Sequence, residues 1–418
     1  MAFRHLFGTK QKGCQRFAMR LPSECYQMQQ TIEQHMPHLR ASQITGLVLW
    51  VYGTILARSG CQNAVAVALV VVGSYNSMRQ YLREWLYDGR DRAKPCEVQL
   101  DVRTCFVPLL RWVLSLWQSD RLVLAIDPTM KADQINSIVI SVVYRSCAIP
   151  VAWHILPANR PGQWIAPVVD LLKLLSVAMP KDKTVLVMCD RGLRSPRLWK
   201  QICSVGWHPY VRQSINTVFC PDGGTRLPAR TLVPGPGHAY VGYGTAFRDT
   251  SKRRRGTMIV VWDRDHDEPC VVMTDLPPAE SGVCWYALRF WIELGLKALK
   301  SVGWQWQKTR RTDPRRVSRH WLVLSVATLL ALAYGTRVED ADDLGRAPGR
   351  LRTPPKYLPH PYRRADSRPR RVVSVLYQGI TWLNRLLLKG RLWRRIWLLP
   401  EAWPEPSPNL KIIYHPYT

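Results

Sequence analysis

One stretch of the sequence places an acid, several cations and a phenol at helical spacing. Residues 285–300 have the periodicity of a helix, and steps of three or four residues put these side chains on one face: Tyr286, Arg289, Glu293, Lys297 and Lys300. A single carboxylate among phosphate-binding groups is typical of a metal ligand beside a nucleic-acid backbone. Taken alone, Glu293 would be better interpreted as the partner of Lys297 in a surface ion pair at the next turn. The interpretation therefore depends on acids elsewhere in the chain.

Two aspartates supply those acids, and each follows a run expected to form a buried strand. Asp127 directly follows the apolar run at 122–126, and Asp190 directly follows the run at 184–189. One such aspartate is usually a helix cap or a turn residue. Two of them favour a shared site, because ligands bind at the carboxyl ends of strands in α/β sheets. The separations of 63 residues (190 − 127) and 103 residues (293 − 190) mean that the site exists only once the sheet has formed.

The composition points to a polyanionic partner. Among 418 residues, 59 are Lys or Arg and 30 are Asp or Glu, giving a net charge of +29, and nucleic acid is the usual partner of such an excess. A merely basic surface is the alternative. Apolar runs at 46–57, 64–73 and 321–334 fall short of the roughly 20 residues that span a bilayer, and the N-terminus lacks a signal-peptide core. We therefore expect a cytoplasmic protein with no membrane partner.

Changes of composition divide the chain into five expected parts: a helical N-terminal region at 1–118, the first part of an α/β core at 119–213, a β-rich insertion at 214–275, the second part of the core at 276–340, and a basic Pro/Arg-rich linker with an amphipathic helical tail at 341–418. Ser42 is expected to cap one N-terminal helix and Ser74 to start another. The second carries Arg79 and Arg83 on one face, which suits either a DNA-reading helix in a helix-turn-helix or an ordinary amphipathic helix.

Other segments carry weaker signals. The basic run at 252–255 is either a DNA-contacting hairpin tip or a solvated loop. Residues 263–267 begin like a calcium loop but lack its glycine and its final glutamate, and the glycines at 235–237 lack a strand–turn–helix context. A helix or helix pair is expected over 372–399, and it could bind DNA, dock a second subunit or contact an acidic membrane.

A family resemblance joins these observations. Tyr286, Arg289, Glu293 and Lys300 have the spacing Y-x2-R-x3-E-x6-K, which resembles the signature of bacterial insertion-sequence transposases with a DDE triad. In that family the first aspartate ends a strand and the second opens an Asp-Arg-Gly segment before a Gly-Trp strand, as in 125–129, 189–192 and 206–212. The resemblance covers about 122–334. It implies an α/β fold with an RNase H-like mixed sheet flanked by helices and interrupted by an all-β insertion.

The resemblance also implies a function. Such an enzyme binds terminal inverted repeats, cleaves DNA and joins the 3′ end to target DNA. Asp127, Asp190 and Glu293 would be catalytic and hold two Mg²⁺ ions, which Mn²⁺ can replace, because hard cations prefer carboxylate oxygens. Tyr286, Arg289 and Lys300 would contact DNA phosphates.

A homodimer on DNA in the bacterial cytoplasm, associated with the nucleoid, follows by analogy. Two alternatives remain open: a related nuclease without strand transfer, and a domesticated DNA-binding protein with an inactive nuclease fold.

Overall fold

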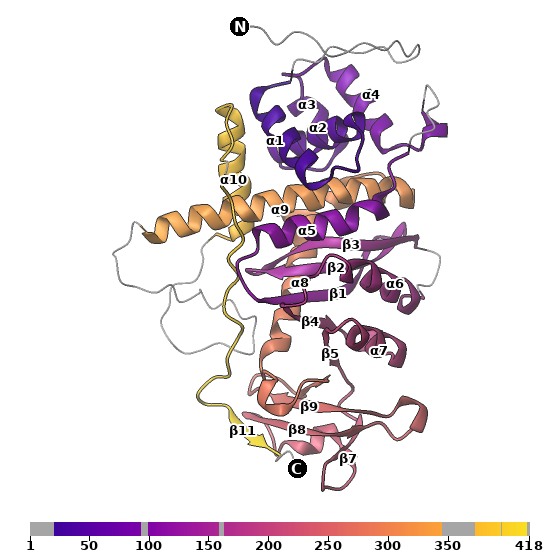
Figure 1. Cartoon of the computed structure of the whole chain (residues 1–418), viewed down its shortest axis with the longest axis vertical. Helices are drawn as coiled ribbons and strands as arrows, with labels where there is room; N and C mark the ends of the chain where they lie inside the picture. Colours follow the sequence, from indigo (N-terminus) through magenta and orange to yellow (C-terminus); the bar gives the residue numbers. More distant parts are fainter. Residues whose placement is uncertain (1–20, 93–98, 159–162, 345–372, 394, 416–418) are drawn as a thin grey trace.

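A single mixed sheet runs along the molecule, with most of the helices gathered at one end (Figure 1). The computed structural model describes residues 21–92, 99–158, 163–344, 373–393 and 395–415. In these residues the strand order is β3-β2-β1-β4-β5-β10-β9-β8-β6-β7, and β11 pairs with β8.

The first half of this sheet forms the α/β core. Its strands are β1 (Arg121–Lys131), β2 (Ile135–Tyr144), β3 (Cys147–Pro157), β4 (Thr184–Cys189) and β5 (His208–Arg212). The first three form an antiparallel meander, whereas β4 is parallel to β1 and β5 is parallel to β4. The parallel strands follow the helices α6 (Ile165–Ser176) and α7 (Pro196–Ser204), as parallel pairing requires a crossover. This mixed arrangement confirms the predicted RNase H-like fold class.

The β-rich insertion continues the same sheet. Its strands are β6 (Val218–Pro221), β7 (Leu227–Pro228), β8 (His238–Ala246), β9 (Arg254–Trp262) and β10 (Cys270–Thr274). Strand β10 pairs with β5 through Val272↔Arg212 and Met273↔Val211, which joins the insertion to the core. The insertion interrupts the core in sequence, as predicted, but it lengthens the core sheet in space.

The N-terminal helices pack at the β3 end of the molecule (Figure 1). They are α1 (Ser23–His35), α2 (Ala41–Ala57), α3 (Gln62–Ala68) and α4 (Tyr75–Leu86), followed by α5 (Phe106–Leu116). Ser74 caps α4 by accepting a hydrogen bond from the backbone N–H of Ser77, as predicted. The prediction for Ser42 was wrong: the N-cap of α2 is Arg40, two residues earlier, and the Gln43 side chain accepts a hydrogen bond from the Arg40 N–H. Arg79 and Arg83 on α4 are exposed, and their role in DNA reading stays a prediction.

The long helix α9 (Pro314–Leu344) separates α1–α4 from the sheet, whereas α5 lies on the sheet side of α9 (Figure 1). It is longer than the apolar run at 321–334 because charged residues extend it at both ends. Residues Pro314–Asp340 are long and apolar enough to cross a membrane, and the bent pair α2–α3 passes the same test as a unit. However, 94% of the apolar window in α9 is buried inside the protein, which is the pattern of a core helix.

The C-terminal part packs against the rest of the chain. Helix α10 (Val375–Leu388) lies against α9 and stops before Gly390, whose φ of +66° a helix cannot accommodate, so the predicted helix to residue 399 is too long. Beyond it an extended segment, residues 395–414, which we call the strap, runs alongside the sheet and ends as β11 (Lys411–Tyr414), parallel to β8 (Figure 1). Within the strap, the Trp403 ring packs against the Trp285 ring with 4.6 Å between the ring centres, and the Arg121 guanidinium lies over both rings.

Candidate catalytic site

Strand β1 carries Asp127 at the point where one of its two neighbours ends. The parallel pairing with β4 stops at Ile126↔Cys189, while the antiparallel pairing with β2 continues through Asp127↔Val139 to Lys131. The prediction that the strand ends at Asp127 therefore holds for the pairing with β4, but it is wrong for the pairing with β2. Because β4 ends beside Ile126, β1 extends past its neighbour at this point, and we call this place the step in the sheet. The Asp127 side chain lies at the step, with 14% of its surface exposed.

Asp190 follows the neighbouring strand β4 at the same step. It precedes a short 3-10 turn, Arg191–Leu193, and its side chain is 40% exposed. Its Oδ1 atom is nevertheless buried and has no hydrogen-bond partner among the described residues. The nearest cation is the Arg212 Nη1 atom at 3.9 Å, too far for a hydrogen bond. Arg212 was not predicted, although its place at the end of β5 is the same signal that identified the two aspartates.

The segment expected as one helix consists of three different helical turns. Trp285–Arg289 is a 3-10 turn, α8 (Phe290–Lys297) is α-helical, and Ala298–Val302 is a π turn. The Tyr286 hydroxyl donates to the Cys189 carbonyl at 3.0 Å and thereby ties the first turn to the end of β4, next to Asp190. This contact brings the partly buried Tyr286 side chain to the site, and its predicted contact with DNA stays a prediction.

Arg289 connects two of the predicted acids. Its Nη2 atom donates to Asp127 Oδ1 at 2.6 Å and its Nη1 atom to Glu293 Oε1 at 2.8 Å. The guanidinium is 11% exposed, whereas the Glu293 side chain is 45% exposed. Glu293 thus pairs with the arginine one turn earlier rather than with Lys297. Arg289 was predicted to contact phosphate, and in this structure it is engaged by the two carboxylates instead.

The ionisation of these groups reflects their crowding. Burial raises the pKa of Asp127 to about 6; Arg289 opposes this shift, and the negative charges of Glu293 and Asp190 add to it. Burial works against the charged form of Arg289, but attraction to Tyr286, Asp127 and Asp190 outweighs it and raises the arginine pKa. Burial lowers the pKa of Lys300, with partial compensation from Asp127. Three carboxylates therefore interact across this step in the sheet.

A cavity of about 740 Å³ opens beside Asp127 and Glu293. Lys297 and Lys300 line it as well, so the predicted helix face does present its acid and its two lysines to one space. Asp190 is not among the lining residues, and it approaches the other acids from the end of β4 instead. The arrangement brings carboxylates and cations to one cavity, which is what binding a phosphodiester beside a metal centre requires.

The donor set fits divalent cations by its chemistry. The carboxylates come from β1, from the residue after β4, and from α8. One Asp190 oxygen is buried and has no hydrogen-bond partner among the described residues. The positively charged Arg289 guanidinium lies between Asp127 and Glu293, where a metal ion would also be attracted. As they stand, however, the described residues contain no group of three or more His, Cys, Asp or Glu side chains arranged to hold a metal ion. Arg289 lies between Asp127 and Glu293 and is hydrogen-bonded to both.

One family model matches part of the chain. Residues 161–330 match the family model described as the transposase DDE domain, a family that generally uses divalent metal ions. The match includes Asp190 and Glu293 and begins after Asp127.

No curated protein matches the sequence. Among solved structures, the piggyBac transposase synaptic complex with hairpin DNA has a TM-score of 0.41 and 11% identity, covering 92% of this chain and 86% of that one. A likeness this distant carries no information on residue roles. What the comparisons show is that residues 161–330 are similar to the transposase DDE domain.

Proposed function

We propose that the chain is an insertion-sequence transposase that binds transposon ends, cleaves DNA and joins the 3′ end to target DNA. The observation that supports this most strongly is the meeting of Asp127 and Glu293 on one guanidinium, at the step in the sheet where Asp190 lies. Acids from three distant elements gain nothing structurally from this place, since burial first, and then the negative charges of Glu293 and Asp190, raise the pKa of Asp127.

The proposed roles follow from the positions of the side chains. Asp127, Asp190 and Glu293 would hold two Mg²⁺ ions, or Mn²⁺ in their place. When bound, such ions activate the attacking oxygen and stabilise the leaving oxygen of an in-line phosphoryl transfer. With a pKa of about 6, Asp127 is mostly ionised at neutral pH and is available as a ligand.

The basic side chains serve the DNA. Lys297 and Lys300 line the cavity beside the acids, where they can contact phosphates near the cleaved bond. When metal ions and DNA bind, Arg289 would break its hydrogen bond to Asp127 or Glu293 and become free to bind a phosphate oxygen. Tyr286 would keep the Asp190 end of β4 in place through its hydrogen bond to the Cys189 carbonyl.

The partners in this proposal are the terminal inverted repeats and target DNA, with a homodimer on DNA because two ends are cut together. In the host this places the protein in the bacterial cytoplasm, at the nucleoid.

A strand-transfer assay tests the proposal. The purified full chain is incubated with Mg²⁺, a supercoiled target plasmid and labelled duplexes taken from the DNA that flanks its reading frame. We expect cleaved ends and 3′-joined products. Asp127→Asn, Asp190→Asn and Glu293→Gln should each lose both products by at least a hundredfold while end binding persists.

The alternatives give different results. Cleavage without joining would identify a nuclease, and binding without cleavage by the wild type would identify a DNA-binding protein with an inactive site. A variant that cleaves at the wild-type rate removes its residue from the catalytic set.

A further inference from the structure

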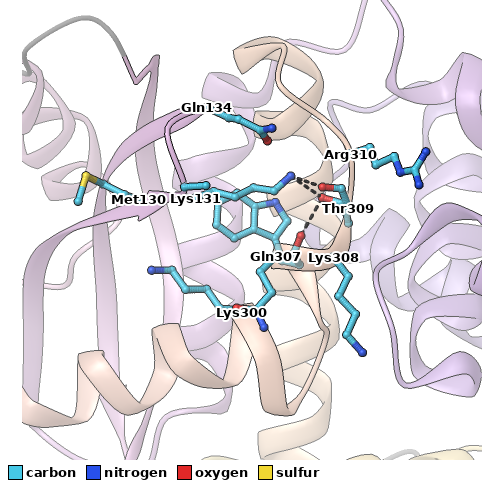
Figure 2. Close-up of a pocket in the computed structure, with 10 residues that line it drawn as sticks. Met130, Lys131, Gln134, Lys300, Gln307, Lys308, Thr309 and Arg310 are labelled. Atoms are coloured by element: carbon cyan, nitrogen blue, oxygen red, sulfur yellow. Dashed lines mark hydrogen bonds between the residues drawn. The ribbon is translucent and has the colours of Figure 1, made fainter.

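A second cavity, of about 640 Å³, adjoins the candidate catalytic site. The end of β1 and the following turn form one side, and residues 306–310 form the other (Figure 2). It shares three lining residues with the catalytic cavity, namely Met130, Lys300 and Gln307. The two cavities are therefore neighbours along one continuous surface.

A buried lysine fixes the shape of this second cavity. Lys131, at the end of β1, reaches across to the opposite segment and donates to the carbonyls of Thr309 and Arg311 and to the Thr309 hydroxyl (Figure 2). Its ammonium also lies 5.7 Å from the centre of the Trp306 ring. The Lys131 ammonium is thus bound by groups of the protein itself, and it connects β1, which carries Asp127, to the segment that follows α8 and the π turn.

The other cations at this cavity have no such partners. Lys308 and Arg310 are exposed, and no hydrogen bond or ion pair joins either side chain to another described residue. Within the described part of the chain, none of the lining residues is acidic. The buried Trp306 indole N–H, in the cavity wall, also lacks an acceptor among the described residues. The surroundings therefore favour an anion strongly.

The directions of the cations indicate the kind of anion. In Figure 2 the side chain of Lys300 extends toward the Met130 side, that of Arg310 extends to the opposite side, and that of Lys308 extends downward. Charges that spread apart match successive phosphates of an extended chain better than one free phosphate. The volume lies within the usual range for small ligands, roughly 300–1,000 Å³, which suits a short stretch of one strand rather than a duplex.

We propose that this cavity binds phosphodiester groups of a single DNA strand as it leaves the catalytic cavity, with Lys308 and Arg310 as its principal contacts. The assignment rests on the proposed function and adds to it a path for the strand. Lys300, shared by both cavities, would mark the junction.

The test measures the salt dependence of DNA binding. Fluorescein-labelled duplexes, one blunt and one with a ten-nucleotide single-stranded extension, are titrated with full-length protein by fluorescence anisotropy in EDTA, over a series of KCl concentrations. The variant is Lys308→Ala/Arg310→Ala. The control is Lys173→Ala/Lys181→Ala, which removes the same charge from exposed positions on α6 and the loop after it. Circular dichroism melts establish that both fold like the wild type.

We expect the double variant to lose about 1.4 from the slope of log K against log[KCl] on the extended duplex, since each single-strand phosphate contact contributes roughly 0.7. At 0.15 M salt this corresponds to an affinity loss on the order of tenfold. The blunt duplex should lose much less, and the control should match the wild type on both.

Three results would overturn the proposal. An unchanged slope removes Lys308 and Arg310 from the DNA contacts, and equal losses on both duplexes refute a single-strand site. Displacement of the extended duplex from the wild type, but not from the variant, by 10 mM potassium phosphate at constant ionic strength would assign the cavity to free phosphate. A wild type that binds neither duplex would instead refute the proposed function itself.

Discussion

Asp127→Asn should stabilise the metal-free protein even though it removes a catalytic group. The ionised Asp127 is held in a buried place beside two other carboxylates, and its pKa of about 6 exceeds the ordinary 3.8. The folded state therefore binds the proton more tightly than the unfolded state does. Stability falls as pH rises from about 4 to about 6, and the penalty is constant above that range. An asparagine resembles the protonated form and avoids this penalty.

The size of the effect follows from the two pKa values. A difference of about 2 between them corresponds to about 3 kcal/mol at pH 7 to 8, and to about half of that at pH 5. Urea unfolding of wild type and Asp127→Asn in EDTA, at pH 5, 6, 7 and 8, measures the difference. The benefit of the asparagine should roughly double across this range.

The same experiment has a control and a clear contradiction. Mn²⁺ should raise the unfolding midpoint of the wild type, because a ligand that binds only the folded state stabilises it, and should leave the asparagine variant nearly unchanged. A variant that is less stable than the wild type at every pH would refute the crowding of negative charge at this site. A benefit that does not change between pH 5 and 8 would refute the raised pKa.

Further predictions concern the elements that position the acids. Gly295→Ala should cost about 1–3 kcal/mol in urea unfolding, because an added Cβ would lie 2.6 Å from the backbone of β3, and an unchanged midpoint would refute this packing. Trp403→Ala should cost about 1–3 kcal/mol by removing the strap's contact with Trp285, and Trp403→Phe should recover most of it; equal stabilities would show that the strap does not hold this segment. Tyr286→Phe should cost about 1 kcal/mol, because it removes the hydrogen bond to the Cys189 carbonyl, and no loss would make that bond irrelevant.

The sequence was sufficient to predict the elements that carry the acids. The apolar runs before Asp127 and Asp190 form adjacent parallel strands, as buried runs ending in an acid indicate. The helical periodicity after residue 285 likewise placed Glu293 on a helix whose lysines face the same cavity. These features depend on local pattern, which the sequence displays directly.

Other features depend on contacts between distant residues. The extension of β1 past Asp127 results from backbone pairing with β2, which continues regardless of side-chain polarity. Spacing alone could not decide whether Arg289 meets a phosphate or the carboxylates of its neighbours. The strap has no periodicity to recognise, and its position depends on Trp403 and on the pairing of β11 with β8.

Iron-mediated cleavage of the protein tests most directly whether the three acids form one metal site. Fe²⁺ replaces Mg²⁺, and ascorbate with peroxide generates radicals that cut the backbone near the bound iron, with the cuts mapped by mass spectrometry. We predict cuts in three windows, around Asp127, Asp190 and Glu293, all suppressed by excess Mg²⁺ and all lost together in Asp190→Asn. Cuts missing from any of the three windows, or windows that disappear independently of one another, would contradict a shared site.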